Sequence, residues 1–86
     1  MDQLSLFVVA LVVDVVRPGL GLVTCGEADF SGSIVRQDGR YLVESEAGDV
    51  IARVGSYREG AVKLARHHGV DSTVLDVTVE FERIEL

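Results

Sequence analysis

Cysteine is almost absent from the chain, and this absence limits how the protein is held together. The 86 residues include one cysteine, one proline, one methionine and no tryptophan. A single cysteine, Cys25, excludes an internal disulfide and a cysteine-based metal cage, and it favours a reducing compartment. We interpret Cys25 as a small buried hydrophobic residue.

Positive charge is scarce as well. Eight Lys and Arg residues stand against fourteen Asp and Glu residues, which gives a net charge of −6. General affinity for nucleic acid or for an anionic membrane requires clustered Lys and Arg, so the composition disfavours both partners. The charge is also uneven, because residues 36–69 hold six bases and five acids while residues 70–86 hold one base and five acids.

No hydrophobic run is long enough to span a bilayer. The apolar run over residues 4–13 is interrupted only by Ser5 and is followed by Asp14. It is well short of the ~20 residues that a membrane-spanning helix needs. A secretory signal would begin with basic residues, whereas Asp2 is the only early charge. We therefore expect one folded domain over residues 1–86, in the cytoplasm and without a membrane partner.

Periodicity and turn signals predict an α+β fold. The fold class is a mainly antiparallel sheet of about five strands, at most six, with one helix packed on one face. Asp38-Gly39 is a strong signal for a two-residue hairpin turn, and Pro18-Gly19 marks another turn. The expected strands cover residues 4–16, 20–25, 33–36, 41–45, 50–54 and 73–86.

The helix is the best-defined element in the sequence. Ser56 and Glu59 have the spacing of a capping box, and Gly69 stands where a left-handed C-terminal cap belongs. The helix is thus expected to run from Ser56 to about His68. Gly60 lies beside its packing face and is expected to allow a close approach to the sheet. That face consists of Tyr57, Ala61, Leu64, Ala65 and His68.

The first strand is apolar on both faces, and one helix can cover only one of them. We expect a second copy of the chain to cover the other face, sheet against sheet, in a homodimer. A sheet curled into a half-barrel is the alternative. The residues assigned to the self-interface are Phe7, Val9, Leu11, Val13 and Val15.

No catalytic, cofactor-binding or metal-binding residues stand out, so we expect a protein that is not an enzyme. His67 and His68 are adjacent and point about 100° apart on a helix, so they cannot act together as metal ligands. The glycines at 19, 21 and 26 lack the spacing and the following helix of a dinucleotide-binding loop. Asp14 is interpreted as a strand-end residue that reaches water, or as an interface residue.

Two surfaces are candidates for binding a partner. The last strand alternates, with Leu75, Val77, Val79 and Phe81 on a buried face and an acidic stripe on the other. The stripe resembles a row of phosphates and suits a basic groove on another protein. The exposed helix face is mostly basic and suits an acidic partner. The candidate residues are Asp76, Glu80 and Glu82 on the strand, and Arg58, Val62, Lys63 and Arg66 on the helix.

Residues 39–69 resemble HicB-like antitoxins in the order of hairpin and helix, and in Gly55, Ser56, Glu59 and Ala61 at the helix start. Gly60 stands where those proteins usually have alanine, and their proline-rich segment is absent. The resemblance implies a dimeric, acidic protein that binds and blocks a basic partner. Small phage-encoded inhibitors are similar in size, acidity and lack of catalytic residues.

The preferred hypothesis is therefore a non-enzymatic protein–protein interaction module, dimeric and inhibitor-like, that occupies the surface of a partner protein. One alternative is nucleic-acid binding through the helix residues Arg58, Lys63 and Arg66, assisted by arginines of the hairpins. Those hairpin arginines are Arg36, Arg40 and Arg53. A second alternative is a small-ligand carrier with a half-barrel cavity, although the sequence shows no polar groups that would furnish such a pocket.

Overall fold

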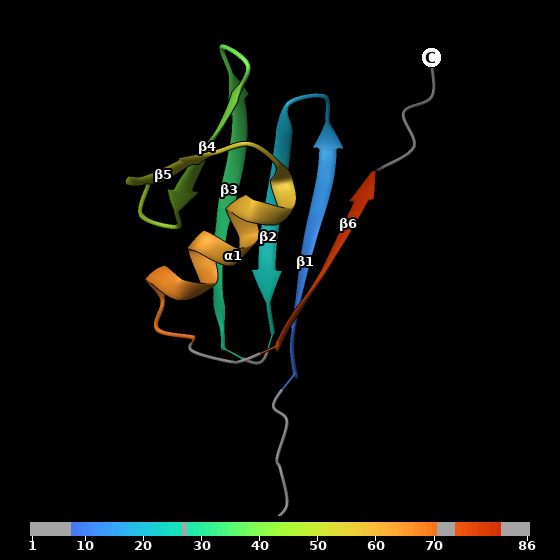
Figure 1. The fold of residues 1–86 in the computed structure, drawn as a ribbon, viewed down its shortest axis with the longest axis vertical. Helices are drawn as coiled ribbons and strands as arrows, with labels where there is room; N and C mark the ends of the chain where they lie inside the picture. Colours follow the sequence, from blue (N-terminus) through green and yellow to red (C-terminus); the bar gives the residue numbers. More distant parts are fainter. Residues whose placement is uncertain (1–7, 27, 71–73, 82–86) are drawn as a thin grey trace, which may run out of the picture.

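A six-stranded sheet with one helix on one face makes up the fold (Figure 1). The computed structural model describes residues 8–26, 28–70 and 74–81. This confirms the α+β prediction with its upper number of strands. The elements are β1 (Val8–Arg17), β2 (Leu20–Cys25), β3 (Phe30–Gln37), β4 (Arg40–Ser45), β5 (Val50–Val54), α1 (Tyr57–His67) and β6 (Val74–Phe81).

The strands lie in the order β5-β4-β3-β2-β1-β6, so β5 and β6 are the two edges of an open sheet. Neighbouring strands are antiparallel except β1 and β6, which are parallel. The helix connects one edge strand to the other across a single face of the sheet (Figure 1). Asp38 and Gly39 both have positive φ values, 53° and 76°, as a type I′ hairpin turn requires.

The start of the helix has the predicted capping interactions. The Ser56 Oγ accepts a hydrogen bond from the Glu59 N–H at 3.1 Å. The Glu59 carboxylate reaches back one residue further than in the usual capping box, and accepts from the Gly55 N–H at 2.9 Å. Gly69 follows the helix with a φ of 80°, as predicted for the C-terminal cap.

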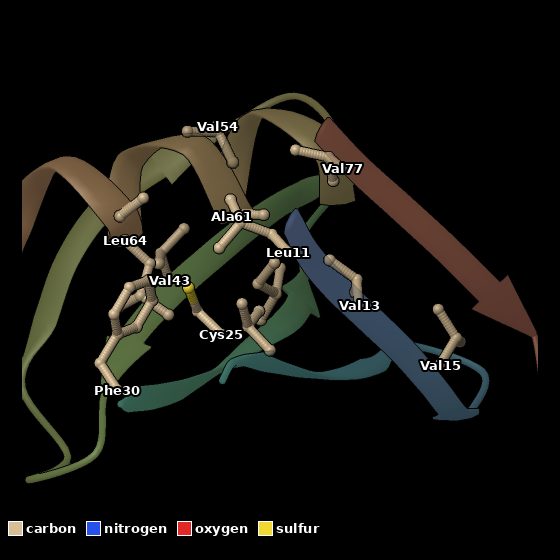
Figure 2. Packing of buried hydrophobic residues seen from close by; sticks show 13 residues of the cluster. Leu11, Val13, Val15, Cys25, Phe30, Val43, Val54, Ala61, Leu64 and Val77 are labelled. Atoms are coloured by element: carbon tan, nitrogen blue, oxygen red, sulfur yellow. The ribbon is translucent and has the colours of Figure 1, made fainter. Parts of the chain in front are cut away.

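The hydrophobic core lies between the helix and the sheet. Leu64 and Ala61 of the helix pack over Val43 and Leu11 of the sheet, and Val15 lies further along β1 (Figure 2). All five side chains are buried. The remaining members of the core are Val13, Val23, Cys25, Phe30, Ile34, Val54, Ala65 and Val77.

Two glycines let the helix lie close to the sheet. A Cβ on Gly60 would lie 2.6 Å from the Ile34 Cδ1, which confirms the close approach predicted for this residue. A Cβ on Gly32 of β3 would lie 2.6 Å from both the Glu44 backbone oxygen and the Leu64 Cδ2. Such distances are shorter than van der Waals contact, so a side chain at either position requires neighbouring atoms to move, and at Gly32 one of them is a backbone oxygen.

The predicted self-interface is wrong in its choice of face. Leu11 and Val13 are fully buried and Val15 is 5% exposed within a single copy of the chain. Val9 is half-buried against the same core, and Phe7 lies outside the described residues. Both faces of β1 are apolar, so its own alternation does not select the face that meets the helix. The neighbouring strands make that selection, because Val13 pairs with Val23 of β2, which also faces the helix.

Candidate functional site

The face of the sheet opposite the helix has no second layer among the described residues (Figure 1). We call it the open face. Directly opposed residues on adjacent strands point to the same side of a sheet, so the strand registers identify its members. They are Val8, Ala10, Val12, Asp14 and Arg17 of β1, Leu20, Leu22 and Thr24 of β2, Ser31, Ser33, Val35 and Gln37 of β3, Arg40, Leu42 and Glu44 of β4, Val50 and Arg53 of β5, and Val74, Asp76, Thr78 and Glu80 of β6.

The middle of the open face is apolar. Leu20 pairs with Val35, Val35 pairs with Leu42, and Leu22 and Val12 lie beside them on β2 and β1. These five residues, from four adjacent strands, form what we call the open-face patch. Leu22 is 42% exposed, which is high for a leucine in an inner strand. Water therefore contacts an apolar surface where a monomeric protein usually places polar residues.

Acidic residues border the open-face patch on one side. Asp14 of β1 lies directly opposite Glu80 of β6, and Asp76 lies opposite Ala10. The predicted acidic stripe is thus on the open face, with Asp76 and Glu80 exposed and Glu82 outside the described residues. Like charges opposed across two strands repel each other. This edge of the sheet therefore favours contact with a positively charged group.

On its other face, β6 meets the core as predicted, except at its end. Val77 is 5% exposed, and Leu75 and Val79 are half-buried. Phe81, which the alternation assigned to the buried face, is 71% exposed.

The basic helix face predicted from the sequence is partly used by the fold itself. The Arg58 Nη1 donates a hydrogen bond to the Val77 carbonyl oxygen at 2.9 Å, which ties the helix to β6. Val62 is half-buried against the core, whereas Lys63 and Arg66 are exposed. The guanidinium group of Arg58 is therefore a structural contact more than a free cation.

The arginines of the nucleic-acid alternative do not gather on one surface. Arg36 lies on the helix side of the sheet, with its guanidinium carbon 6.0 Å from the centre of the Tyr41 ring. Arg53 pairs with Leu42 and therefore belongs to the open face. Nucleic-acid binding through a continuous basic patch thus has little support from this arrangement.

A pocket of about 400 Å³ lies on the helix side of the sheet, at the end where the helix begins. The sequence predicted no pocket here, although Val15 belonged to the predicted self-interface and Arg36 to the nucleic-acid alternative. Three aromatic rings meet there: the Tyr41 and Tyr57 centroids are 4.8 Å apart, and the Tyr57 and Phe81 centroids are 6.4 Å apart. We call it the aromatic pocket. Its lining consists of Val15, Arg17, Pro18, Gly19, Arg36, Tyr41, Tyr57 and Phe81.

Local sequence holds Tyr57 in this position. It is the first residue of the helix, directly after the Ser56 cap. Its ring packs over Gly21 of β2, where an added Cβ would lie 3.0 Å from the Tyr57 Cδ1. The pocket therefore depends on the helix start, on one glycine, and on strands that are distant in the sequence.

Tyr57 is expected to ionise at a higher pH than a free tyrosine. Burial raises the pKa of its phenol above 10.0, and the nearby Tyr41 raises it further, while a hydrogen bond from the Gly19 backbone and the charge of Arg36 oppose the shift. The stability that Tyr57 contributes is fully present below the pKa of the unfolded chain, near 10. It is lost as the pH rises through the folded-state pKa.

Tyrosinate absorbance against pH measures this shift, because the chain has two tyrosines and no tryptophan. Wild type should show an ionisation above the ordinary range, and Tyr57→Phe should remove it. Ionisation of both tyrosines at the pKa of free tyrosine would refute the assignment.

The histidines and the described carboxylates form no metal site. His68 stacks on Phe30 with ring centroids 4.6 Å apart and planes 8° from parallel, and His67 meets it edge-on at 5.3 Å. Within residues 8–26, 28–70 and 74–81, no group of three or more His, Cys, Asp or Glu is arranged to hold a metal ion. The one helix in those ranges is too short to cross a membrane.

Comparisons with family models, with curated proteins and with solved structures found no match to this chain. The resemblance of residues 39–69 to HicB-like antitoxins stays a prediction from the sequence. The open face and the aromatic pocket therefore carry the functional argument.

Proposed function

We propose that this chain is a non-enzymatic protein-interaction module that acts in the cytoplasm as a homodimer and occupies the surface of a second protein. The observation that carries the proposal is the open-face patch, which places apolar side chains from four strands in contact with water. An exposed apolar patch on an otherwise charged protein favours burial against another protein.

A second copy of the chain is the occupant that fits the open face. The five strands β1 to β5 lie about 4.8 Å apart, and about six residues of each at about 3.3 Å give a face of about 480 Å² without β6. Two such faces together bury about 950 Å², close to the ~1,000 Å² expected of a specific interface. The patch lies on the central strands, so a two-fold axis through the middle of the face would cover it in both copies at once.

The acidic edge remains accessible in such a dimer, because β6 is the outermost strand. Asp76 and Glu80 project from it, and a basic protein surface is the partner that they favour. The resemblance to HicB-like antitoxins implies the same kind of protein, namely a dimeric acidic binder that blocks a basic partner.

Reversing the charge of this edge should abolish capture of the partner. With Asp76→Lys and Glu80→Lys in one chain, we expect the amount of the main captured protein to fall by about tenfold or more, since like charges across an interface repel strongly. Capture from a lysate, followed by identification of the bound protein, measures the effect.

The matched control is Glu46→Lys with Asp49→Lys, which reverses two exposed acids in the turn between β4 and β5. The control should capture as wild type does. Equal capture by both double variants would show that Asp76 and Glu80 of β6 do not bind the partner protein.

A further inference from the structure

The aromatic pocket differs in charge from the rest of the protein. Among the residues that the structure describes, no Asp or Glu lines this pocket, although the chain is acidic. Two arginines line it, Arg17 at the end of β1 and Arg36 near the end of β3. Arg17 lies opposite Leu20 of the open face, whereas Arg36 lies on the helix side with its guanidinium group near the Tyr41 ring. An anion that enters the pocket therefore meets the Arg36 guanidinium and no carboxylate of the described residues.

The walls of the pocket suit a flat apolar group. Tyr57 meets Tyr41 at a tilt of 58° and meets Phe81 edge-on at 78°, so the three rings are in contact with one another at the wall of the pocket. Aromatic rings bind other rings at centroid distances of about 4.5–7 Å. The volume of about 400 Å³ lies in the range of small-molecule sites.

Phe81 gives the pocket an exposed apolar wall. It is the most exposed of the large hydrophobic residues in the described part of the chain, at 71%. It also stands at the rim, in edge contact with Tyr57. A ligand ring beside Phe81 would remove this apolar surface from water, which favours binding.

We propose that the aromatic pocket binds a small aromatic carboxylate. The ring of the ligand packs against Tyr57 and Phe81, and its carboxylate binds the guanidinium group of Arg36. Guanidinium recognises a carboxylate through two parallel N–H···O hydrogen bonds, which a neutral or cationic head group cannot accept in the same way. This site lies on the opposite side of the sheet from the open face, so it does not depend on dimerisation.

Naphthoate is a suitable probe, and naphthamide is its neutral counterpart of nearly the same shape. We expect naphthoate to shift the NMR signals of the Tyr41 and Tyr57 rings, which are the only tyrosines of the chain, in a saturable titration. Naphthamide should bind about tenfold more weakly, because it lacks the charge that strengthens the hydrogen bonds to arginine. Equal binding of the two probes, or no saturable shift with naphthoate, would overturn the proposal.

Arginine substitutions locate the site. Arg36→Gln should weaken naphthoate binding by about tenfold and leave naphthamide binding unchanged, since only the charge-assisted contact is lost. Arg66→Gln is the matched control, because Arg66 is an exposed arginine of the helix that does not line the pocket. The control should bind naphthoate as wild type does.

Phe81→Ala tests the wall of the pocket without disturbing the core, because Phe81 is largely exposed. It should weaken naphthoate and naphthamide alike. Wild-type binding in both Arg36→Gln and Phe81→Ala would place any bound naphthoate elsewhere and overturn the proposal. If naphthoate does not bind in the aromatic pocket, the dimer proposal still stands, because the solution mass of the protein is measured without ligand.

Discussion

Replacing Gly32 with alanine is expected to lower the free energy of unfolding by about 3 kcal/mol, because the added methyl group overpacks a closely fitted site. Its Cβ would lie 2.6 Å from a backbone oxygen of β4 and 2.6 Å from the buried Leu64. The Leu64 side chain has little free space, and the Glu44 backbone oxygen belongs to a paired strand. The overlap with the added methyl group is therefore relieved only if the helix or the sheet moves.

Urea denaturation followed by circular dichroism measures the effect. Gly26→Ala is the matched control, since an added Cβ there meets no atom within 4 Å. The control should change the free energy of unfolding by less than about 0.5 kcal/mol. If Gly32→Ala were as stable as this control, the close packing of the helix against β3 would be refuted.

A double-mutant cycle separates the two contacts of the added methyl group. Leu64→Ala alone should cost about 2–5 kcal/mol, because it opens a cavity in the core. Combined with Gly32→Ala, it should cost less than the sum of the single changes, since the cavity accepts the new methyl group.

Leu22→Lys is expected to convert the dimer into a folded monomer. Leu22 lies in the open-face patch and is 42% exposed in a single chain, so a lysine there reaches water in the monomer. In the proposed dimer two ammonium groups would be buried close to each other, with the Asp14 carboxylate opposite each of them on β1 as its counter-charge. The cost of such burial is several kcal/mol per charge, which exceeds what one side of a small interface supplies.

The mass in solution and the circular dichroism spectrum together measure this change. Ala47→Lys, at the exposed turn between β4 and β5, adds the same charge away from the open-face patch and should leave the mass as in wild type. Equal masses for Leu22→Lys and wild type would exclude the open face as the self-interface.

Local signals in the sequence were enough to predict most elements of the fold. The Ser56–Glu59 pair marked the helix start because two side chains satisfy free backbone groups there. Asp38-Gly39 marked a hairpin because few other residues adopt positive φ at two successive positions. Such features depend on neighbours along the chain, so the sequence displays them directly.

The face of β1 that meets the core was not predictable in this way. Val12 and Val13 are equally apolar, and only the strands beside them decide which one is buried. The register is fixed when β2 pairs with β1 on one side and β6 pairs with it on the other. For this reason the sequence predicted an uncovered apolar face on β1 but assigned the self-interface to the face that meets the helix.

The aromatic pocket was also beyond sequence reasoning. Tyr41, Tyr57 and Phe81 come from β4, the helix and β6, and no spacing relates them. They meet because the helix crosses from one edge of the sheet to the other, and because β6 then pairs in parallel with β1. Contacts of this kind depend on topology, which local propensity does not encode.

The mass of the wild-type protein in solution tests the central claim most directly. Light scattering behind a sizing column, over a series of protein concentrations, should give a stable value of twice the 9.3 kDa of one chain. That result would place the open-face patch in a self-interface. A mass of 9.3 kDa at every concentration would contradict the dimer and leave the open face to a different protein.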